Sequence, residues 1–247
     1  MRLRRFRRAV TLGLVLALCI PRLWLYRLRG PLTLERRARW GHATGQQLIA
    51  ALGIRIAVTG RLPERGLLVS NHLSYLDILI YGTVVPCFFV SKAEIRSWPF
   101  FGWMSRAGGT LYVDRSSRAS AELATNQIAE RIQGTVPVLF FPEGTSSDGS
   151  QLLRFHSRFF TPAVAGGIPV TTAAIRYVPG DGSPERDLCW FGDAPFLPHL
   201  WKALGAPGFT AEVHFGEPHV YPDRRTAADE TYAEIEAMRS GGVLAHQ

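Results

Sequence analysis

Short apolar runs alternate along the chain with longer segments of helical periodicity. Runs with strand character cover residues 54–59, 66–70, 86–91, 109–113, 136–141, 169–177 and 209–216. Apolar residues at helical spacing, with Gly and Pro near the ends, predict helices at 34–52, 76–83, 92–106 with a break at Pro99, 117–133, 157–166 and 225–240. Strands that alternate with helices predict an α/β fold: a single domain in which helices flank a mostly parallel sheet.

The beginning of the chain has a different pattern. Arginines fill most of positions 2–8, the run Ala9–Ile20 carries no charge, and Leu23–Tyr26 extends it beyond Pro21 and Arg22. Twelve apolar residues are fewer than the roughly 17–25 that span a bilayer. We expect residues 1–32 to be a retained membrane anchor and residues 33–247 to be the folded domain. A cleaved signal peptide has a similar layout and is the alternative.

The charge also differs between the N-terminal segment and the rest of the chain. The net charge is +8, yet residues 1–40 hold 11 of the 28 basic residues and one of the 20 acidic ones, so the remainder is slightly acidic. A uniformly basic domain would have indicated a nucleic acid partner. We expect no nucleic acid and place the arginines on anionic head groups of a lipid bilayer. Cys19, Cys87 and Cys189 form no Cys-x-x-Cys pair, which argues against a disulfide framework.

Candidate chemistry begins after the apolar run at 67–70, where His72 and Asp77 stand five positions apart. A carboxylate can hold one imidazole nitrogen and leave the other free as a base. A hydrogen-bonded loop histidine without catalytic function has the same spacing, so this pair alone decides nothing.

A second polar segment, Phe141–Gly149, follows the apolar run at 136–140. Ligands bind at the carboxyl ends of parallel strands, so two such ends can place Glu143 beside His72. The alternative for Pro-Glu-Gly-Thr is a solvated turn, which does not explain an acidic residue directly against an apolar strand.

Together these segments resemble the glycerolipid acyltransferase family, typified by bacterial lysophosphatidate acyltransferase. The first block of the family, Asn-His-x-Ser-x-x-Asp, is matched at residues 71–77, and Phe-Pro-Glu-Gly-Thr is matched at 141–145. Two further blocks resemble Gly109–Arg115 and Ile168–Val170, and the segments 91–94 and 98–103 resemble the stretch between the first two blocks. The resemblance covers roughly residues 40–220, in order and at sensible spacing.

The resemblance implies O-acyl transfer in membrane lipid biosynthesis without a cofactor or a metal ion. His72 would take the proton of the acceptor hydroxyl, Asp77 would orient the ring, and the alkoxide would attack an acyl thioester. Backbone N–H groups or nearby donors would hold the oxyanion. The donor partner would be acyl-CoA or acyl-carrier protein. Because these thioesters are cytosolic, the expected location is the cytoplasmic face of the inner membrane.

Other residues receive roles from the same resemblance. Glu143 is associated with acceptor binding, and Gly144 and Thr145 shape its loop. Asn71 and Ser74 would support the catalytic pair, although both are also ordinary turn formers. Lys92, Arg115 and Arg154 are phosphate candidates, each with a plain alternative as a surface charge.

Position 146 departs from the pattern of the family. Lysophosphatidate enzymes usually carry Arg after Phe-Pro-Glu-Gly-Thr, where it can bind phosphate, but this chain has Ser146. We expect the acceptor to be 1-acylglycerol-3-phosphate or a related lysolipid. The alternative is a phosphate-free acceptor such as lyso-ornithine lipid, which the Gly-Thr-Ser-Ser-Asp-Gly sequence resembles more closely.

An aromatic cluster at 98–104 includes Trp98, Phe100, Phe101, Trp103 and Met104. It is consistent with a core helix, an acyl-chain channel or an interfacial belt.

Competing classes lack their signatures. The chain has no Gly-x-Ser-x-Gly elbow of a serine hydrolase and no Gly-rich nucleotide loop. His72, Asp77 and Glu143 could ligate a metal, but no second histidine or further carboxylate is obviously placed with them. A non-catalytic membrane-binding relative would be expected to lose His72 or Asp77, and this chain keeps both.

Overall fold

The computed structural model describes residues 2–114 and 118–241. A seven-stranded sheet in the order β1-β7-β6-β2-β5-β3-β4 runs through its centre. The strands are β1 (Arg55–Thr59), β2 (Leu67–Ser70), β3 (Phe88–Lys92), β4 (Leu111–Val113), β5 (Val138–Phe140), β6 (Val170–Pro179) and β7 (Phe209–Phe215). All paired neighbours are parallel except β6 and β7. The predicted α/β fold with a mostly parallel sheet is confirmed.

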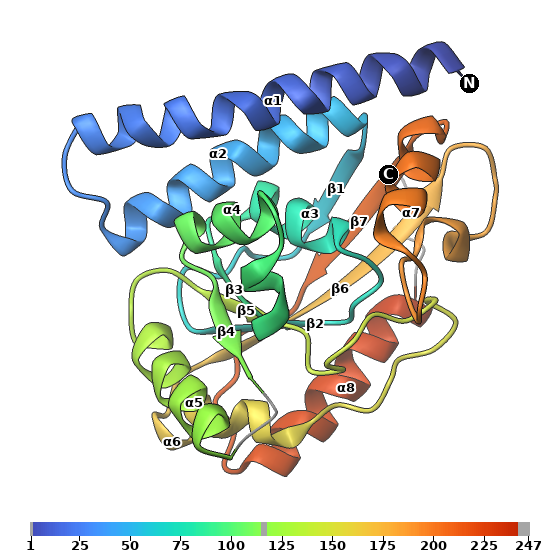
Figure 1. Ribbon diagram of the computed structural model, residues 1–247. Helices are drawn as coiled ribbons and strands as arrows, with labels where there is room; N and C mark the ends of the chain where they lie inside the picture. Colours follow the sequence, from blue (N-terminus) through green and yellow to red (C-terminus); the bar gives the residue numbers. More distant parts are fainter. Residues whose placement is uncertain (1, 115–117, 242–247) are drawn as a thin grey trace.

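Helices cover both faces of the sheet (Figure 1). They are α1 (Arg2–Leu28), α2 (Leu34–Leu52), α3 (Leu76–Val84), α4 (Phe101–Gly108), α5 (Arg118–Ile132), α6 (Thr161–Ala165), α7 (Phe196–Gly205) and α8 (Arg224–Ser240). Short 3₁₀ turns occupy Ala93–Ser97, Ser157–Phe160 and Glu185–Leu188. The helix expected at 92–106 is therefore a 3₁₀ turn followed by α4, and α7 was not predicted.

Side chains of β2 alternate between two cores because successive residues of a strand face opposite sides. Leu67 and Val69 pack with residues of α5, α6 and α8. Leu68 packs with residues of α2, α3 and α7 on the other face. Each of the three β2 side chains is fully buried. The near-continuous apolar runs in the sequence thus reflect strands that are covered on both sides.

Local signals account for the ends of α2. The Thr33 hydroxyl accepts a hydrogen bond from the Arg36 backbone N–H at the first turn. At the other end Gly53 adopts a left-handed conformation with φ of 68°, and its N–H reaches the last turn of the helix. These two residues fix the length of α2 and turn the chain into β1.

The first helix is longer than the apolar run that predicted it. α1 continues through Pro21 and lies along α2 at the top of the molecule (Figure 1). One side packs against the domain through Cys19 and Leu23, which are buried. The opposite side exposes apolar residues along the helix, namely Leu3, Phe6, Val10, Leu14, Leu18, Ile20, Trp24, Leu25 and Leu28. Among the described residues, only α1 is long and apolar enough to cross a membrane by length and composition.

Candidate active site

Two neighbouring parallel strands bring the polar loops together. In the β2–β5 pair, Leu67 is opposite Val138 and Val69 is opposite Phe140. Both strands therefore end at the same edge of the sheet. The loop after β2 carries His72, and the loop after β5 carries Glu143. The expected proximity is present: Glu143 Oε1 accepts a hydrogen bond from the backbone N–H of His72 at 2.7 Å.

His72 and Asp77 form a direct hydrogen-bonded pair. The distance from His72 Nδ1 to Asp77 Oδ2 is 2.7 Å. Asp77 lies in the first turn of α3 and is fully buried, whereas the His72 side chain keeps 17% exposure. No described residue hydrogen-bonds His72 Nε2, and the residue lines the main cavity of the protein. One nitrogen is thus held by a carboxylate while the other faces open space.

The backbone around the pair also holds Asp77. The N–H groups of Leu73 and Ser74 donate to Asp77 Oδ2 at 2.7 and 3.0 Å. The other oxygen, Oδ1, accepts a hydrogen bond from the Tyr177 hydroxyl of β6. These donors replace the hydrogen bonds to water that a buried carboxylate loses. Tyr177 was missed from the sequence because a tyrosine in an apolar strand carries no catalytic signal.

The aromatic ring of Phe141 packs against one face of the His72 imidazole and fixes its orientation. The imidazole stacks on Phe141, with ring centroids 3.9 Å apart and planes 9° from parallel. Phe141 belongs to the Phe-Pro-Glu-Gly-Thr segment, so that segment contributes a packing surface as well as polar groups. The Asp77 bond and this stacking together leave the ring little freedom to turn.

Glu143 is directed into the loops rather than into the cavity. Its Oε2 accepts a hydrogen bond from the Leu153 backbone N–H at 2.9 Å, while Oε1 accepts from His72. Both oxygens therefore tie backbone segments together. Burial raises the Glu143 pKa to about 7, although these two N–H bonds act in the opposite direction. This geometry favours a role in holding the His72 loop over direct contact with an acceptor.

Asn71 and Ser74 have structural partners. The Asn71 amide exchanges two hydrogen bonds with the backbone of Ile175, at 3.1 and 2.8 Å, and so joins the end of β2 to β6. The Ser74 hydroxyl accepts from the Leu76 N–H at 3.3 Å, at the start of α3. Both side chains are buried and set the path of the loop that carries His72.

The residues after Glu143 line the cavity. Gly144, Thr145 and Ser146 are all part of its wall. Gly144 has a positive φ of 73°, which a residue with a side chain rarely adopts. The Ser146 hydroxyl donates to the Trp190 carbonyl oxygen at 2.5 Å, so its proton is used inside the protein.

The phosphate candidates have different surroundings. Lys92 is exposed and lines the cavity, in which Glu94 is the carboxylate among the described lining residues. Arg154 is exposed and does not line it. Arg115 lies outside the described residues. Within the described part of the chain, no group of three His, Cys, Asp or Glu side chains is arranged to hold a metal ion.

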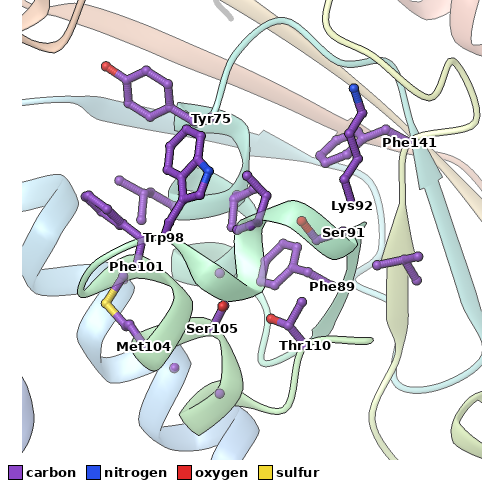
Figure 2. Close-up of a pocket in the computed structure, with 18 of the residues that line it drawn as sticks. Tyr75, Phe89, Ser91, Lys92, Trp98, Phe101, Met104, Ser105, Thr110 and Phe141 are labelled. Carbon is purple, nitrogen blue, oxygen red and sulfur yellow. The ribbon is translucent and has the colours of Figure 1, made fainter. Parts of the chain in front are cut away.

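The cavity itself has a volume of about 600 Å³ and is mainly apolar. His72 lines it together with Tyr75, Phe89, Trp98, Phe101 and Met104, and Figure 2 labels all of these side chains except His72. Its far wall comes from three helices, through Leu12 and Leu16 of α1, Trp40 and Leu48 of α2, and Phe196 and Leu200 of α7. Of the predicted aromatic cluster, Phe100 and Trp103 pack beside buried Trp40 instead. The cluster is thus divided between cavity wall and core.

Arginines at the start of α1 hold the wall of this cavity. Arg4 donates to the Gly205 carbonyl oxygen at 2.8 Å, and Arg8 donates to the Ala206 carbonyl oxygen at 2.7 Å. The Arg5 guanidinium lies 5.2 Å from the centre of the Trp201 ring. These groups cap the carbonyl end of α7, where cations are favourable. We call Arg4, Arg5 and Arg8 the arginine clasp; the expectation that the N-terminal arginines serve head groups overlooked this contact.

Comparisons with known proteins agree with the geometry. A family model described as Acyltransferase matches residues 55–176. The lyso-ornithine lipid O-acyltransferase of Pseudomonas aeruginosa is 36% identical over 74% of this chain and 70% of its own length. The enzyme of that name from Rhodobacter capsulatus is 37% identical, with coverage of 78% and 72%. The 1-acyl-sn-glycerol-3-phosphate acyltransferase of Neisseria gonorrhoeae is 35% identical, with coverage of 70% and 69%.

A solved structure is similar over nearly the whole chain. The 1-acyl-sn-glycerophosphate (LPA) acyltransferase PlsC of Thermotoga maritima superposes with a TM-score of 0.71, covering 97% of this chain and 94% of that one. The two sequences are 18% identical. This similarity establishes a shared fold.

Proposed function

The chain belongs to the acyltransferase family and is an acyltransferase, and from this premise we propose that it transfers a fatty acyl chain from an acyl thioester to the free hydroxyl of a lysolipid. The observation that carries the proposal is the His72–Asp77 pair, whose free Nε2 faces a largely apolar cavity. A base beside an apolar cavity suits a reaction between a hydroxyl group and a fatty acyl chain.

In the proposed reaction, His72 Nε2 takes the proton of the acceptor hydroxyl. The oxygen attacks the thioester carbonyl, a C–O bond forms, and the C–S bond breaks. The proton on His72 then passes to the departing thiolate, so the enzyme returns to its starting state. Asp77 stabilises the imidazolium that forms between these two transfers. No acyl-enzyme is required, because a thiolate is a good leaving group.

We place the acyl chain in the apolar part of the cavity. A volume of about 600 Å³ is within the range of roughly 300–1,000 Å³ for ligand pockets. Much of the cavity lining is aliphatic and aromatic, as at Leu16, Leu48 and Phe101. Such a surface stabilises methylene groups by about 0.8 kcal/mol each when water is excluded.

For the acceptor, we favour a head group that carries both signs of charge. The described cavity lining contains Lys92 as its single Lys or Arg and Glu94 as its single Asp or Glu. An ornithine head group, with a carboxylate and an ammonium group, matches this pair better than a phosphate dianion does. Relatives named lyso-ornithine lipid O-acyltransferase support this choice. Lysophosphatidate is the second candidate, because Lys92 can bind phosphate and the Neisseria relative carries that name.

We further propose that the protein binds the cytoplasmic surface of a bilayer through the outer face of α1. Leu14 and Leu18 are 60% and 47% exposed on this face. A helix with one side on the protein and an apolar opposite side fits interfacial binding. Replacing both leucines with Glu should release the protein from anionic vesicles in a sedimentation assay. The matched control is Leu62→Glu, 43% exposed outside α1; equal sedimentation of the two variants would move the membrane contact elsewhere.

The activity is tested by a mass-spectrometric acyl-transfer assay on detergent-solubilised protein. It offers acyl-CoA and acyl-carrier protein as donors, with lyso-ornithine lipid and lysophosphatidate as acceptors. The wild type should form a diacylated product, and His72→Ala should form none while melting at a similar temperature. The control His214→Ala removes a histidine that bonds Thr59 at the sheet edge. Activity of His72→Ala within a few-fold of wild type would refute the assignment of the base.

A further inference from the structure

Asp77 of the proposed catalytic pair is hydrogen-bonded by Tyr177, a residue outside the family blocks found in the sequence. Asp77 Oδ2 takes all of its hydrogen bonds from residues 72–74, which belong to its own segment. Oδ1 takes its hydrogen bond from the Tyr177 hydroxyl, which reaches it from the middle of the sheet. β6 and α3 are separate elements that this hydrogen bond joins. No other hydrogen bond of the described residues reaches Oδ1.

The direction of this hydrogen bond follows from its chemistry. An ionised carboxylate can only accept, so the phenolic hydroxyl donates. Burial and the neighbouring Asp77 charge hold the Tyr177 pKa well above its usual value, so the donor proton stays in place. Asp77 and Tyr177 are 0% and 1% exposed. Because water cannot reach either group, the hydroxyl is the donor that compensates this oxygen.

The position of Tyr177 is fixed by elements other than α3. Its backbone N–H donates to Glu185 Oε1 at 2.7 Å. Its ring lies 4.8 Å from the Phe209 ring, and it pairs across the antiparallel ladder with Ala211. The hydroxyl is therefore presented to Asp77 by the rigid β6–β7 pair rather than by a flexible loop.

We propose that Tyr177 is a positioning residue of the acyltransferase, which holds the Asp77 carboxylate in place so that His72 keeps its proton on Nδ1 and offers Nε2 as the base. The inference rests on the proposed role of the His72–Asp77 pair. The base requires a carboxylate behind it, and the hydrogen bond from Tyr177 takes up part of the carboxylate charge that would otherwise act on the imidazolium alone. Tyr177 thus sets the lower end of the pH range in which the enzyme works.

The expected change follows from the sign of this effect. Removing the hydroxyl takes away the donor to Asp77 Oδ1, so the carboxylate holds the imidazolium of His72 more strongly and the active pair forms at higher pH. The acid limb of kcat/KM for Tyr177→Phe should move to higher pH by about one unit, since a hydrogen bond to a charged group is worth roughly 1–2 pKa units. Activity at pH 6 should fall about tenfold, and activity at pH 8.5 should stay within a few-fold of wild type.

Other titratable groups face this pair and must stay constant in the comparison. They are Tyr81 on α3, Glu143, Glu185, Cys189 and, from α8, Arg239. Tyr177→Phe leaves every one of them in place, so a difference between the two pH profiles reports the hydroxyl. The Glu143 titration contributes equally to both profiles.

Tyr81→Phe is the matched control. Tyr81 is also fully buried, and its hydroxyl lies 2.6 Å from the neutral Ser70 hydroxyl. It does not line the cavity. Loss of this hydroxyl should cost similar stability in a thermal melt while leaving the acid limb where it is in the wild type. A purely structural role for Tyr177 predicts that the two variants behave alike.

The experiment measures pH profiles of acyl transfer for the wild type, Tyr177→Phe, Tyr81→Phe and His72→Ala. An active His72→Ala would refute the proposed function. An inactive His72→Ala together with an unshifted acid limb in Tyr177→Phe would overturn this inference alone. If Tyr177→Phe does not fold, 3-fluorotyrosine at position 177 retains the ring and makes the hydroxyl a stronger donor. The acid limb should then move to lower pH, and an unmoved limb would again overturn the inference.

Discussion

The two ends of the cavity are held together in different ways. At the polar end, His72 and Asp77 lie five residues apart, and backbone N–H groups of the same short segment donate to Asp77 Oδ2. At the apolar end, the wall is assembled from α1, α2 and α7, which are distant in the sequence. There the arginine clasp binds the end of α7 from positions 201 and 198 residues earlier in the chain. The contact between His72 and Asp77 is thus local in the sequence, whereas the Tyr177 hydrogen bond to Asp77 and the apolar part of the cavity depend on tertiary packing.

The largest effect is expected at the polar end, from Asp77→Asn. The amide preserves the shape and can still accept from His72 Nδ1, but it removes the charge that stabilises the imidazolium. Turnover should fall by about 10³–10⁴-fold, as expected when a buried aspartate behind a histidine base is neutralised. Steady-state acyl-transfer rates at pH 7.5 measure this, with a thermal melt to verify folding. A loss smaller than tenfold would mean that the carboxylate charge is unimportant.

Glu143→Gln tests how much the two hydrogen bonds that Glu143 accepts from backbone N–H groups stabilise the loops at the polar end of the cavity. One N–H donor, of His72 or Leu153, would face the amide nitrogen and lose its acceptor. Leaving a buried donor unpaired costs about 1–3 kcal/mol of unfolding free energy. Chemical denaturation measures this cost. The control is Glu217→Gln, which replaces an exposed glutamate.

The same variant has a predicted pH dependence. Burial raises the Glu143 pKa from 4.5 to about 7, so the folded state binds this proton more tightly than the unfolded state does. The corresponding stabilisation is complete below about pH 4.5 and is lost as pH rises through about 7. The stability advantage of the wild type over Glu143→Gln should therefore shrink by up to about 3 kcal/mol between pH 4.5 and 8. A difference that does not vary with pH would contradict the raised pKa.

At the apolar end, Arg8→Ala breaks the arginine clasp. Arg8 is buried, donates to the Ala206 carbonyl, and lies so close to Gly53 that a Cβ there would be 2.5 Å from its Nη2. Its loss should lower the free energy of unfolding by about 1–3 kcal/mol. Because α7 lines the cavity, the KM for the acyl donor should rise more than kcat falls. Arg7→Ala, exposed on the same helix, is the control; identical kinetics for the two variants would refute a role for the clasp in binding.

The smallest expected effect is a change of acyl-chain preference in Gly41→Leu. Gly41 lines the cavity, and a Cβ added there would meet no heavy atom within 4 Å. The new side chain should enter the cavity without displacing a neighbour, and the helix should gain up to about 1 kcal/mol in propensity. A mixed-donor assay should show a shift toward shorter chains. Gly13→Leu on α1 has the same free space but lies outside the cavity lining. An unchanged chain preference in Gly41→Leu would place the acyl chain elsewhere.

Much of the fold and of the catalytic pair could be predicted from the sequence. The apolar runs located the strands because a sheet covered on both faces needs continuous apolar segments. The spacing of His72 and Asp77 was informative because a short segment at a strand end can close a hydrogen bond almost by itself. The neighbouring position of Glu143 followed from the rule that parallel strands end at one edge.

Other features depended on tertiary structure alone. Pattern along the chain did not reveal α7, the two hydrogen bonds that turn Glu143 into the loops, or the Tyr177 hydroxyl on Asp77. The Tyr177 contact joins elements 100 positions apart in the sequence, and a tyrosine in an apolar strand carries no local sign of its partner. The sequence by itself determined that His72 and Asp77 meet after a strand end, because the pair lies within one short segment. Only the packing of distant helices and strands decided how that base is held and which space it faces.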